Sequence, residues 1–159
     1  MALSLICRME GTTISAELRT GSPGETEAAA ERLARRLRAG DLLLLAGPMG
    51  AGKTAFVRGL ARGMGVGGHV SSPTFQLVRI HDGDPGLGHV DIHRLADAAE
   101  LDHLGLEDLL DSGVVAIEWG DRLERTPEGA RTIRVVIEIL DAGSRRLTLT
   151  EAPEGWSWF

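Results

Sequence analysis

The sequence is poor in cysteine and in long apolar runs, and each shortage excludes a class of protein. Its one cysteine, Cys7, excludes an internal disulfide framework and a zinc site built from cysteines, and it suits a reducing compartment. No apolar run approaches the roughly 20 residues that a membrane-spanning helix needs. The apolar segment Met1 to Cys7 is too short for a signal peptide and lacks a basic region. We therefore expect a cytoplasmic protein without a membrane association.

A modest excess of acidic residues limits the choice of partners. With 17 basic and 23 acidic residues the net charge is −6, which argues against an autonomous nucleic-acid binder with a basic face. Contact with RNA through a partner protein stays open. At 159 residues the chain is long enough for one well-buried core and too short for two ordinary domains. Four arginines lie on the polar face of a predicted helix, which favours a solvated surface: Arg32, Arg35, Arg36 and Arg38.

Lys53 is the only lysine of the chain, and it stands inside a phosphate-binding pattern. The segment Gly47-Pro48-Met49-Gly50-Ala51-Gly52-Lys53-Thr54 fits Gly, four free positions, Gly, Lys and then Ser or Thr. Gly47, Gly50 and Gly52 allow the backbone to form a nest of N–H donors. In this pattern the ammonium of Lys53 is expected to reach the β- and γ-phosphates, and the Thr54 hydroxyl is expected to bind Mg²⁺. The pattern predicts a bound nucleoside triphosphate with Mg²⁺.

Periodicity around this loop predicts a single α/β domain over residues 1–159. An all-apolar strand at 42–46 enters the loop, and an amphipathic helix at 53–64 leaves it. A helix over 25–39 is expected to close at Gly40, and a helical region over 97–110 is expected to break at Gly105. Further strands are predicted at 12–19, 75–81, 87–92, 113–117, 133–140 and 147–150. The expected fold is P-loop NTPase-like, with a mixed β-sheet flanked by helices and a C-terminal β-hairpin. Residues 1–20 are expected to form an edge strand or a mobile arm, and 151–159 an aromatic tail.

Two carboxylates are candidates to complete the site. Glu118 follows the apolar strand 113–117, and Asp91 ends a shorter apolar run. Because ligands bind beyond the carboxyl ends of strands in open α/β sheets, either side chain can hold Mg²⁺ or orient an attacking water. Thr74, in Ser71-Ser72-Pro73-Thr74, is the candidate for a hydroxyl that senses the γ-phosphate. A proline-led turn into a strand is the structural alternative for that segment.

Other residues leave alternatives open. His89, Asp91 and His93 alternate along a strand, which raises a rival transition-metal site. The complete phosphate loop makes that rival the weaker explanation. Trp119 either stacks on a base or belongs to the core. The aromatic tail either packs back on the sheet or meets a partner: Trp156, Trp158 and Phe159.

The order of the motifs resembles the bacterial TsaE (YjeE) family. After the phosphate loop come Ser-Pro-Thr-Phe-Gln-Leu-Val, His-Val-Asp-Ile-His-Arg-Leu, Leu-Gly-Leu-Glu-Asp-Leu-Leu and Ile-Glu-Trp, and the similarity runs from about Glu25 to Leu149. The resemblance implies a small P-loop ATPase that works with the TsaB and TsaD proteins. Together they attach a threonylcarbamoyl group to the tRNA adenosine beside the anticodon. ATP binding and hydrolysis would reset the TsaB–TsaD catalyst, and tRNA would be met only through that complex.

The resemblance also assigns roles to individual residues. It implies that Thr54 and Glu118 hold Mg²⁺, that Asp91, Glu118 and Lys53 take part in catalysis, and that Trp119 lies next to the nucleotide. Thr74 falls in a switch-like segment. Two positions depart from the family, which commonly has an acidic residue at Pro48 and a tyrosine at His93. The phosphate-binding residues that it implies are Gly50, Ala51, Gly52, Lys53 and Thr54.

Two other functions fit a phosphate loop in a chain of this length. A small-molecule kinase usually carries an arginine-rich mobile lid, whereas the stretch 97–111 is acidic and holds no arginine. A nucleotide-dependent binding module without turnover is the second alternative. The preference for adenine follows from the resemblance, and the guanine-reading Asn-Lys-x-Asp pattern is absent from the sequence.

Overall fold

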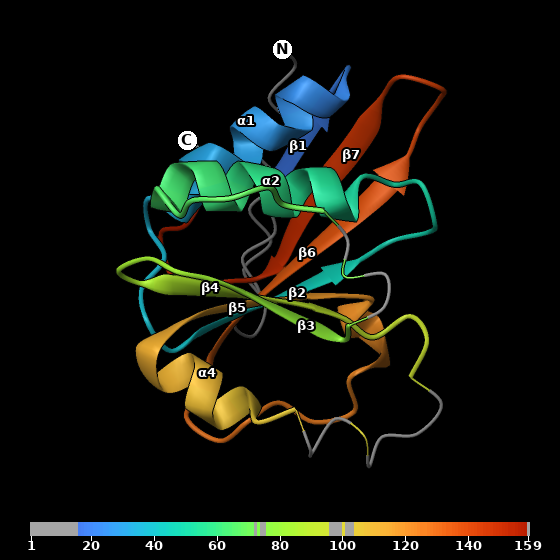
Figure 1. The fold of residues 1–159 in the computed structure, drawn as a ribbon. Helices are drawn as coiled ribbons and strands as arrows, with labels where there is room; N and C mark the ends of the chain where they lie inside the picture. Colours follow the sequence, from blue (N-terminus) through green and yellow to red (C-terminus); the bar gives the residue numbers. More distant parts are fainter. Residues whose placement is uncertain (1–15, 72, 74–75, 96–99, 101–103, 159) are drawn as a thin grey trace.

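A mixed β-sheet organises the chain, as the computed structural model shows for residues 16–71, 73, 76–95, 100 and 104–158 (Figure 1). Within these residues seven strands follow the order β1-β7-β6-β2-β5-β4-β3. Central β2 runs parallel to β5 and β6, and β5 runs parallel to β4. The pairs β3–β4, β6–β7 and β1–β7 are antiparallel. The strands are β1 (Ala16–Thr20), β2 (Asp41–Ala46), β3 (Val78–His81), β4 (Gly86–Asp91), β5 (Gly113–Glu118), β6 (Arg131–Ile139) and β7 (Arg145–Glu151).

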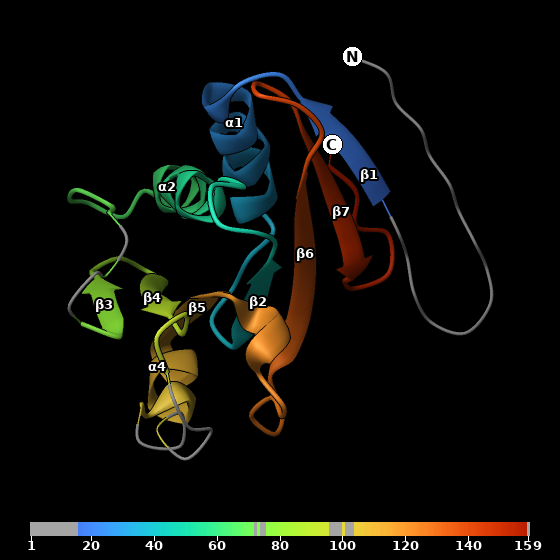
Figure 2. The ribbon, with the colours of Figure 1, turned by 90° about the vertical axis from the view of Figure 1, so that its right-hand side faces the viewer.

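Helices cover both faces of this sheet, as Figure 1 and Figure 2 show. Helices α1 (Pro23–Ala34) and α2 (Lys53–Met64) lie on one face, and α4 (Leu106–Ser112) lies on the other. Alternate residues of β2 therefore enter different cores: Leu43 and Leu45 join the α1–α2 side, whereas Leu42 and Leu44 join the α4 side. This two-sided burial explains why β2 is apolar without alternation. The expected α/β class with a mixed sheet is confirmed.

Most elements lie where periodicity predicts them. The expected C-terminal hairpin is present as the antiparallel pair β6–β7, and β3 and β4 also pair antiparallel. Helix α2 spans the predicted residues, and α4 begins after Gly105, which has φ 64°. Most of the predicted helical segment before Gly105 lies outside the described residues. No helix in the described part of the chain is long and apolar enough to cross a membrane.

The prediction for the first helix was wrong at both ends. It begins at Pro23 because the Ser22 side chain accepts the N–H of Glu25 at 3.2 Å, a cap that contributes about 1 kcal/mol. It ends at Ala34, so Gly40 does not cap it. The Asp41 carboxylate accepts the N–H of Arg38 at 2.9 Å and also binds Arg131. That tertiary contact turns the chain into β2 before the helix could continue.

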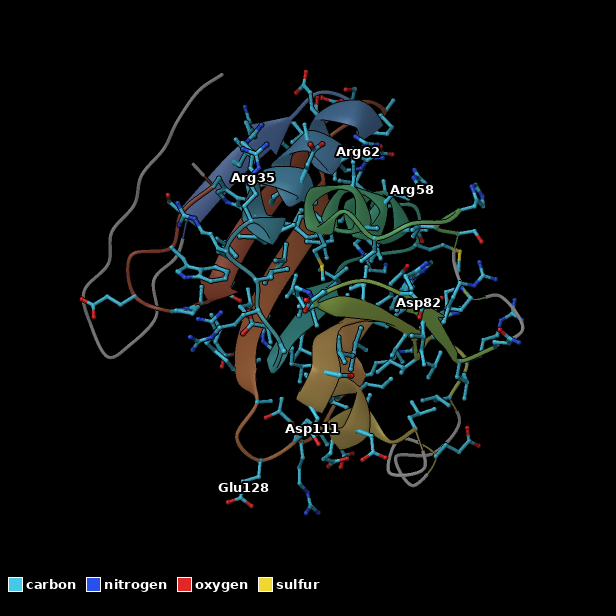
Figure 3. All side chains as sticks on the ribbon, turned by 60° about the vertical axis from the view of Figure 1, so that its left-hand side comes forward. Arg35, Arg58, Arg62, Asp82, Asp111 and Glu128 are labelled. Carbon is cyan, nitrogen blue, oxygen red and sulfur yellow. The ribbon has the colours of Figure 1, made fainter. Side chains whose placement is uncertain are left out.

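Helices α1 and α2 approach each other unusually closely at two glycines. A Cβ on Gly59 would lie 2.1 Å from the carbonyl oxygen of Glu27, and one on Gly63 would lie 2.4 Å from that of Glu31. Arg58 and Arg62, labelled beside α2 in Figure 3, both bind Glu27, at 3.0 and 2.6 Å. The missing side chains at Gly59 and Gly63 therefore allow α1 and α2 to pack closely, and the ion pairs of Arg58 and Arg62 with Glu27 lie beside this contact.

The described part of the aromatic tail packs back on the domain. Trp158 is 2% exposed, and its Nε1–H donates to the Ala16 carbonyl at 2.9 Å. Its ring meets Phe56 edge-to-face at a centroid distance of 6.2 Å. Trp156 lies against the guanidinium of Arg131, 5.2 Å from the ring centroid. The tail thereby ties edge strand β1 to α2.

Candidate nucleotide-binding site

The loop between β2 and α2 has the backbone that its glycines predict. Gly47 has φ 148°, and a Cβ there would lie 2.3 Å from the carbonyl oxygen of Ile137. Only glycine therefore lets the loop leave β2 this close to β6. Gly50 and Gly52 have φ 77° and 106°, and these positive values curl the backbone on both sides of Ala51. The result is the open, curled loop that phosphate binding requires.

Helix α2 has no side-chain cap and no acidic residue of its own at its N-terminus. Its N-cap is Gly52, no side chain caps it, and its first turn holds no acidic residue. By contrast, Glu25 lies in the first turn of α1, and Glu107 and Asp108 in that of α4. The N–H donors and the positive dipole end of α2 remain available to an anion.

A cavity of about 700 Å³ opens at this helix terminus. Most predicted binding residues line it, whereas Gly47 is not among the lining residues. Thr74 is outside the described residues, although its neighbours Pro73 and Gln76 line the cavity. Pro23 and Thr26 of α1 and Gly143 of the β6–β7 turn also line it, and sequence reasoning missed them. The predicted residues in the wall are Gly50, Ala51, Gly52, Lys53, Thr54, Asp91, Glu118 and Trp119.

The Lys53 ammonium folds back onto its own loop. It donates to the carbonyls of Gly47 and Pro48 at 2.7 and 2.9 Å. It also lies 3.8 Å from the centroid of the Trp119 ring. Burial lowers the pKa of Lys53 below its ordinary value, while the carboxylates of Glu118, Asp121 and Asp91 oppose that shift. A lysine that is held by neutral carbonyls and a ring is well placed to exchange them for phosphate oxygens.

Thr54 and Glu118 meet although 64 residues separate them. Thr54 Oγ1 donates to Glu118 Oε1 at 2.8 Å, and His89 Nε2 lies 2.8 Å from the same oxygen. The parallel register of β4 and β5 pairs Asp91 with Glu118. A hydroxyl and a carboxylate are hard oxygen ligands of the kind that Mg²⁺ prefers, so this donor set fits the predicted metal.

Asp91 is held at the cavity by its neighbours in the chain and in the sheet. Its Oδ1 accepts the N–H of His93 at 2.9 Å, and its own N–H donates to the Leu77 carbonyl at 3.1 Å. With Leu77 and Gln76 in the same wall, Asp91 links the segment before β3 to the ends of β4 and β5. Its carboxylate lies on the side of the cavity where Glu118 lies.

The rival transition-metal site finds no support in the described residues. Among them, no group of three His, Cys, Asp or Glu side chains could hold a metal ion. His89 is fully buried and engages Glu118, whereas His93 lies against the Trp119 ring at a centroid distance of 4.6 Å. Of the three alternating residues, Asp91 and His93 line the cavity, whereas His89 is buried outside the lining and contacts Glu118. Trp119 lies in that wall too, with φ 63° at the start of the 3₁₀ helix η1 (Gly120–Arg122).

Comparison with known proteins identifies the family. The family model described as "Threonylcarbamoyl adenosine biosynthesis protein TsaE" matches residues 20–147. The chain belongs to the TsaE family. The resemblance drawn from the order of the motifs is thereby confirmed.

Curated relatives and a solved structure agree with this membership in the TsaE family. The protein named "tRNA threonylcarbamoyladenosine biosynthesis protein TsaE" from Streptomyces coelicolor is 42% identical over 134 residues, 79% of this chain and 90% of that protein. The protein of the same name from Mycobacterium tuberculosis is 40% identical over 138 residues, 80% of this chain and 77% of that protein. The crystal structure of Bacillus subtilis YdiB superposes with a TM-score of 0.73 at 31% identity, covering 90% of this chain and 89% of that one.

Proposed function

We propose that this protein binds and hydrolyses Mg-ATP in support of the TsaB–TsaD complex, during threonylcarbamoylation of the tRNA adenosine next to the anticodon. The observation that carries the proposal is the 2.8 Å contact between Thr54 Oγ1 and Glu118 Oε1, beside the uncapped N-terminus of α2. The relatives from Streptomyces coelicolor and Mycobacterium tuberculosis are named for tRNA threonylcarbamoyladenosine biosynthesis, which supports the role in tRNA modification.

Each residue of the wall has a chemical task in this proposal. The loop N–H groups and the start of α2 bind the phosphates, and Lys53 moves its ammonium from the carbonyls of Gly47 and Pro48 onto them. Thr54 and Glu118 hold Mg²⁺, which when bound neutralises charge on the β- and γ-phosphates. Asp91 orients the attacking water, because its carboxylate lies on the Glu118 side of the cavity.

The positions of Thr54 and Glu118 also indicate which way round the nucleotide lies in the cavity. With Thr54 and Glu118 at the γ-phosphate, we assign the nucleoside to the other arm, between the start of α1 and the β6–β7 turn. Pro23 and Thr26 line this arm from one side, and Ala142 and Gly143 from the other. These small and apolar groups suit the flat face of a base.

The test combines nucleotide binding with partner assembly. Wild-type protein should bind Mg-ATP, release phosphate slowly alone, and change its rate or affinity when TsaB and TsaD are added. Lys53→Ala should abolish ATP binding by calorimetry and nucleotide-dependent copurification with TsaB–TsaD. Arg125→Ala removes the same charge at an exposed position outside the cavity and should leave both unchanged.

Three results would contradict parts of this proposal. Intact ATP affinity in Lys53→Ala would refute the role of the phosphate loop. Indifference of binding and hydrolysis to TsaB and TsaD would refute the partnership. Phosphate release that is unchanged in Glu118→Ala would favour a nucleotide-dependent binding module over an ATPase.

A further inference from the structure

Arg145 contacts the phosphate loop from β7, a strand that is not part of the phosphate-binding sequence motif. It is the first residue of β7, which lies between β1 and β6. Leu147 and Leu149 are buried on the side that α1 and α2 cover, and strand alternation turns Arg145 to the same side. Arg146 faces the opposite side and pairs with Glu138 at 3.5 Å. Two adjacent arginines therefore have different surroundings.

The guanidinium of Arg145 joins two segments through four carbonyl groups. Its Nε–H donates to the Ala51 carbonyl at 3.0 Å, and Nη2 donates to that of Gly50 at 3.2 Å. Nη1 donates to the carbonyls of Asp141 and Ser144 at 3.0 and 2.9 Å. These bonds engage four of the five N–H groups that a guanidinium carries. Four backbone carbonyls thus hold the guanidinium of Arg145, which also lines the cavity.

The contact to the loop determines how one of its peptides points. In a planar trans peptide the C=O and N–H groups point in opposite directions. Because Arg145 holds the carbonyl of Ala51, the N–H of Gly52 in the same peptide points away from Arg145. The positions where a Cβ of Gly50 or Gly52 would stand have no neighbouring atom within 4 Å, so side-chain packing does not hold the loop on those sides. The loop is held by the buried Ala51 side chain and by the Ala51 N–H, which donates to the Pro48 carbonyl at 3.1 Å. Arg145 adds hydrogen bonds from outside the loop.

The turn that presents Arg145 is itself held by hydrogen bonds. Asp141 Oδ1 accepts the N–H groups of Gly143 and Ser144, at 2.9 and 2.8 Å. These bonds, with Gly143 first, hold the pKa of Asp141 below its ordinary value. The β6–β7 turn is therefore a preformed support from which the guanidinium reaches the loop.

We propose that Arg145 is a positioning residue of the phosphate loop: its guanidinium holds the Gly50 and Ala51 carbonyls and thereby keeps the Gly52 N–H turned toward the phosphates. This inference rests on the proposed nucleotide binding and adds a residue to it. Lysine cannot replace the arginine, because one ammonium on a flexible stem lacks the planar fork that spans four carbonyls.

The experiment compares Arg145→Ala and Arg145→Lys with Arg146→Ala, the neighbouring arginine on the other side of the sheet. Calorimetry with Mg-ATP and with inorganic tripolyphosphate measures dissociation constants, and thermal melting without ligand monitors the fold. Arg145→Ala should weaken both ligands about 10-fold, and raise the KM for ATP more than it lowers kcat, because the loop loses preorganisation. Arg145→Lys should recover only part of the loss. Arg146→Ala should bind both ligands as wild type does.

Tripolyphosphate and the ligand-free melts separate the outcomes. If wild type binds neither ligand, the proposed nucleotide binding fails and this inference fails with it. If wild type binds both and Arg145→Ala binds them equally well, only the role of Arg145 is refuted. A loss for ATP without a loss for tripolyphosphate also refutes it, because the loop contacts phosphate alone. Should Arg145→Ala melt early, Arg145→Lys decides: wild-type affinity in that variant overturns the proposal.

Discussion

The ammonium of Lys53 lies 3.8 Å from the centroid of the Trp119 ring. Such a cation–π contact contributes about 0.5–2 kcal/mol, and the carbonyls of Gly47 and Pro48 add hydrogen bonds. Trp119 keeps its ring there with φ 63°, a left-handed conformation that costs a non-glycine residue free energy. The lysine and the ring are therefore linked, and a phosphate that draws Lys53 away must change the surroundings of Trp119.

This link makes Trp119 a reporter of nucleotide binding. Mg-ATP should change the tryptophan emission spectrum, because the ring loses its ammonium neighbour. Trp119→Phe should abolish the change, and Trp156→Phe should retain it, since Trp156 lies against Arg131 outside the cavity. An undiminished change in Trp119→Phe would show that Lys53 does not leave the ring.

Glu118 should be essential for the metal-dependent step. Glu118→Gln keeps the shape of the side chain and removes its charge. Mg²⁺-dependent phosphate release should fall by at least about 100-fold, because losing even a residue that only supports a metal ligand costs about 10- to 100-fold. Nucleotide binding without Mg²⁺ should persist, because the phosphate loop is intact. The matched control is Glu128→Gln, an exposed residue that points outward in Figure 3. Equal rates in the two variants would exclude Glu118 as a metal ligand.

His81 should make the stability of the protein depend on pH. Burial lowers the pKa of His81 below its ordinary value of 6.5, and the neighbouring His89 and Arg79 lower it further. Above pH 6.5 His81 is mostly neutral in both the folded and the unfolded protein. Below pH 6.5 the unfolded protein binds a proton at His81 more readily than the folded protein does, because the folded pKa is lower. The free energy of unfolding should therefore fall as pH drops below about 6.5.

Urea denaturation at pH 7.5 and 5.5 measures this dependence. His81→Gln removes the titrating group and should reduce the difference in stability between the two pH values. His69→Gln, which changes an exposed histidine, provides the control. If His81→Gln and wild type lose the same stability on acidification, the dependence originates elsewhere.

The close contact between α1 and α2 should make Gly59 intolerant of a side chain. In Gly59→Ala the new Cβ would meet the Glu27 carbonyl oxygen, nominally at 2.1 Å, so the helices must separate. Overpacking costs about 1–3 kcal/mol and outweighs the gain in helix propensity, which should lower the melting temperature by roughly 5 °C. Gly67→Ala has open space around the added atom and should melt as wild type does. A wild-type melting temperature in Gly59→Ala would show that α1 and α2 can move apart without a loss of stability.

Elements with strong local patterns were predictable, and elements set by distant contacts were not. The bounds of α2 follow from the loop glycines before it and from Gly65, with φ 68°, after it. The first helix shows the limit. Leu37 continues its apolar periodicity, but the Asp41 carboxylate binds Arg38 and Arg131, the latter 90 residues away, and ends the helix earlier. Such a contact has no signal in a local window.

In the candidate site, too, some features were predictable from local sequence and others required the folded sheet. Spacing along the chain was enough to predict the ligand class, because the nest of N–H groups, Lys53 and Thr54 all lie within one short loop whose glycines permit its backbone. The folded sheet was needed to show what meets that loop. The register of β4 and β5 brings Asp91 and His89 beside Glu118, and the place of β7 between β1 and β6 brings Arg145 to the loop carbonyls. Hydrogen bonds between strands set these neighbours, and strand pairing joins residues that are far apart in the sequence.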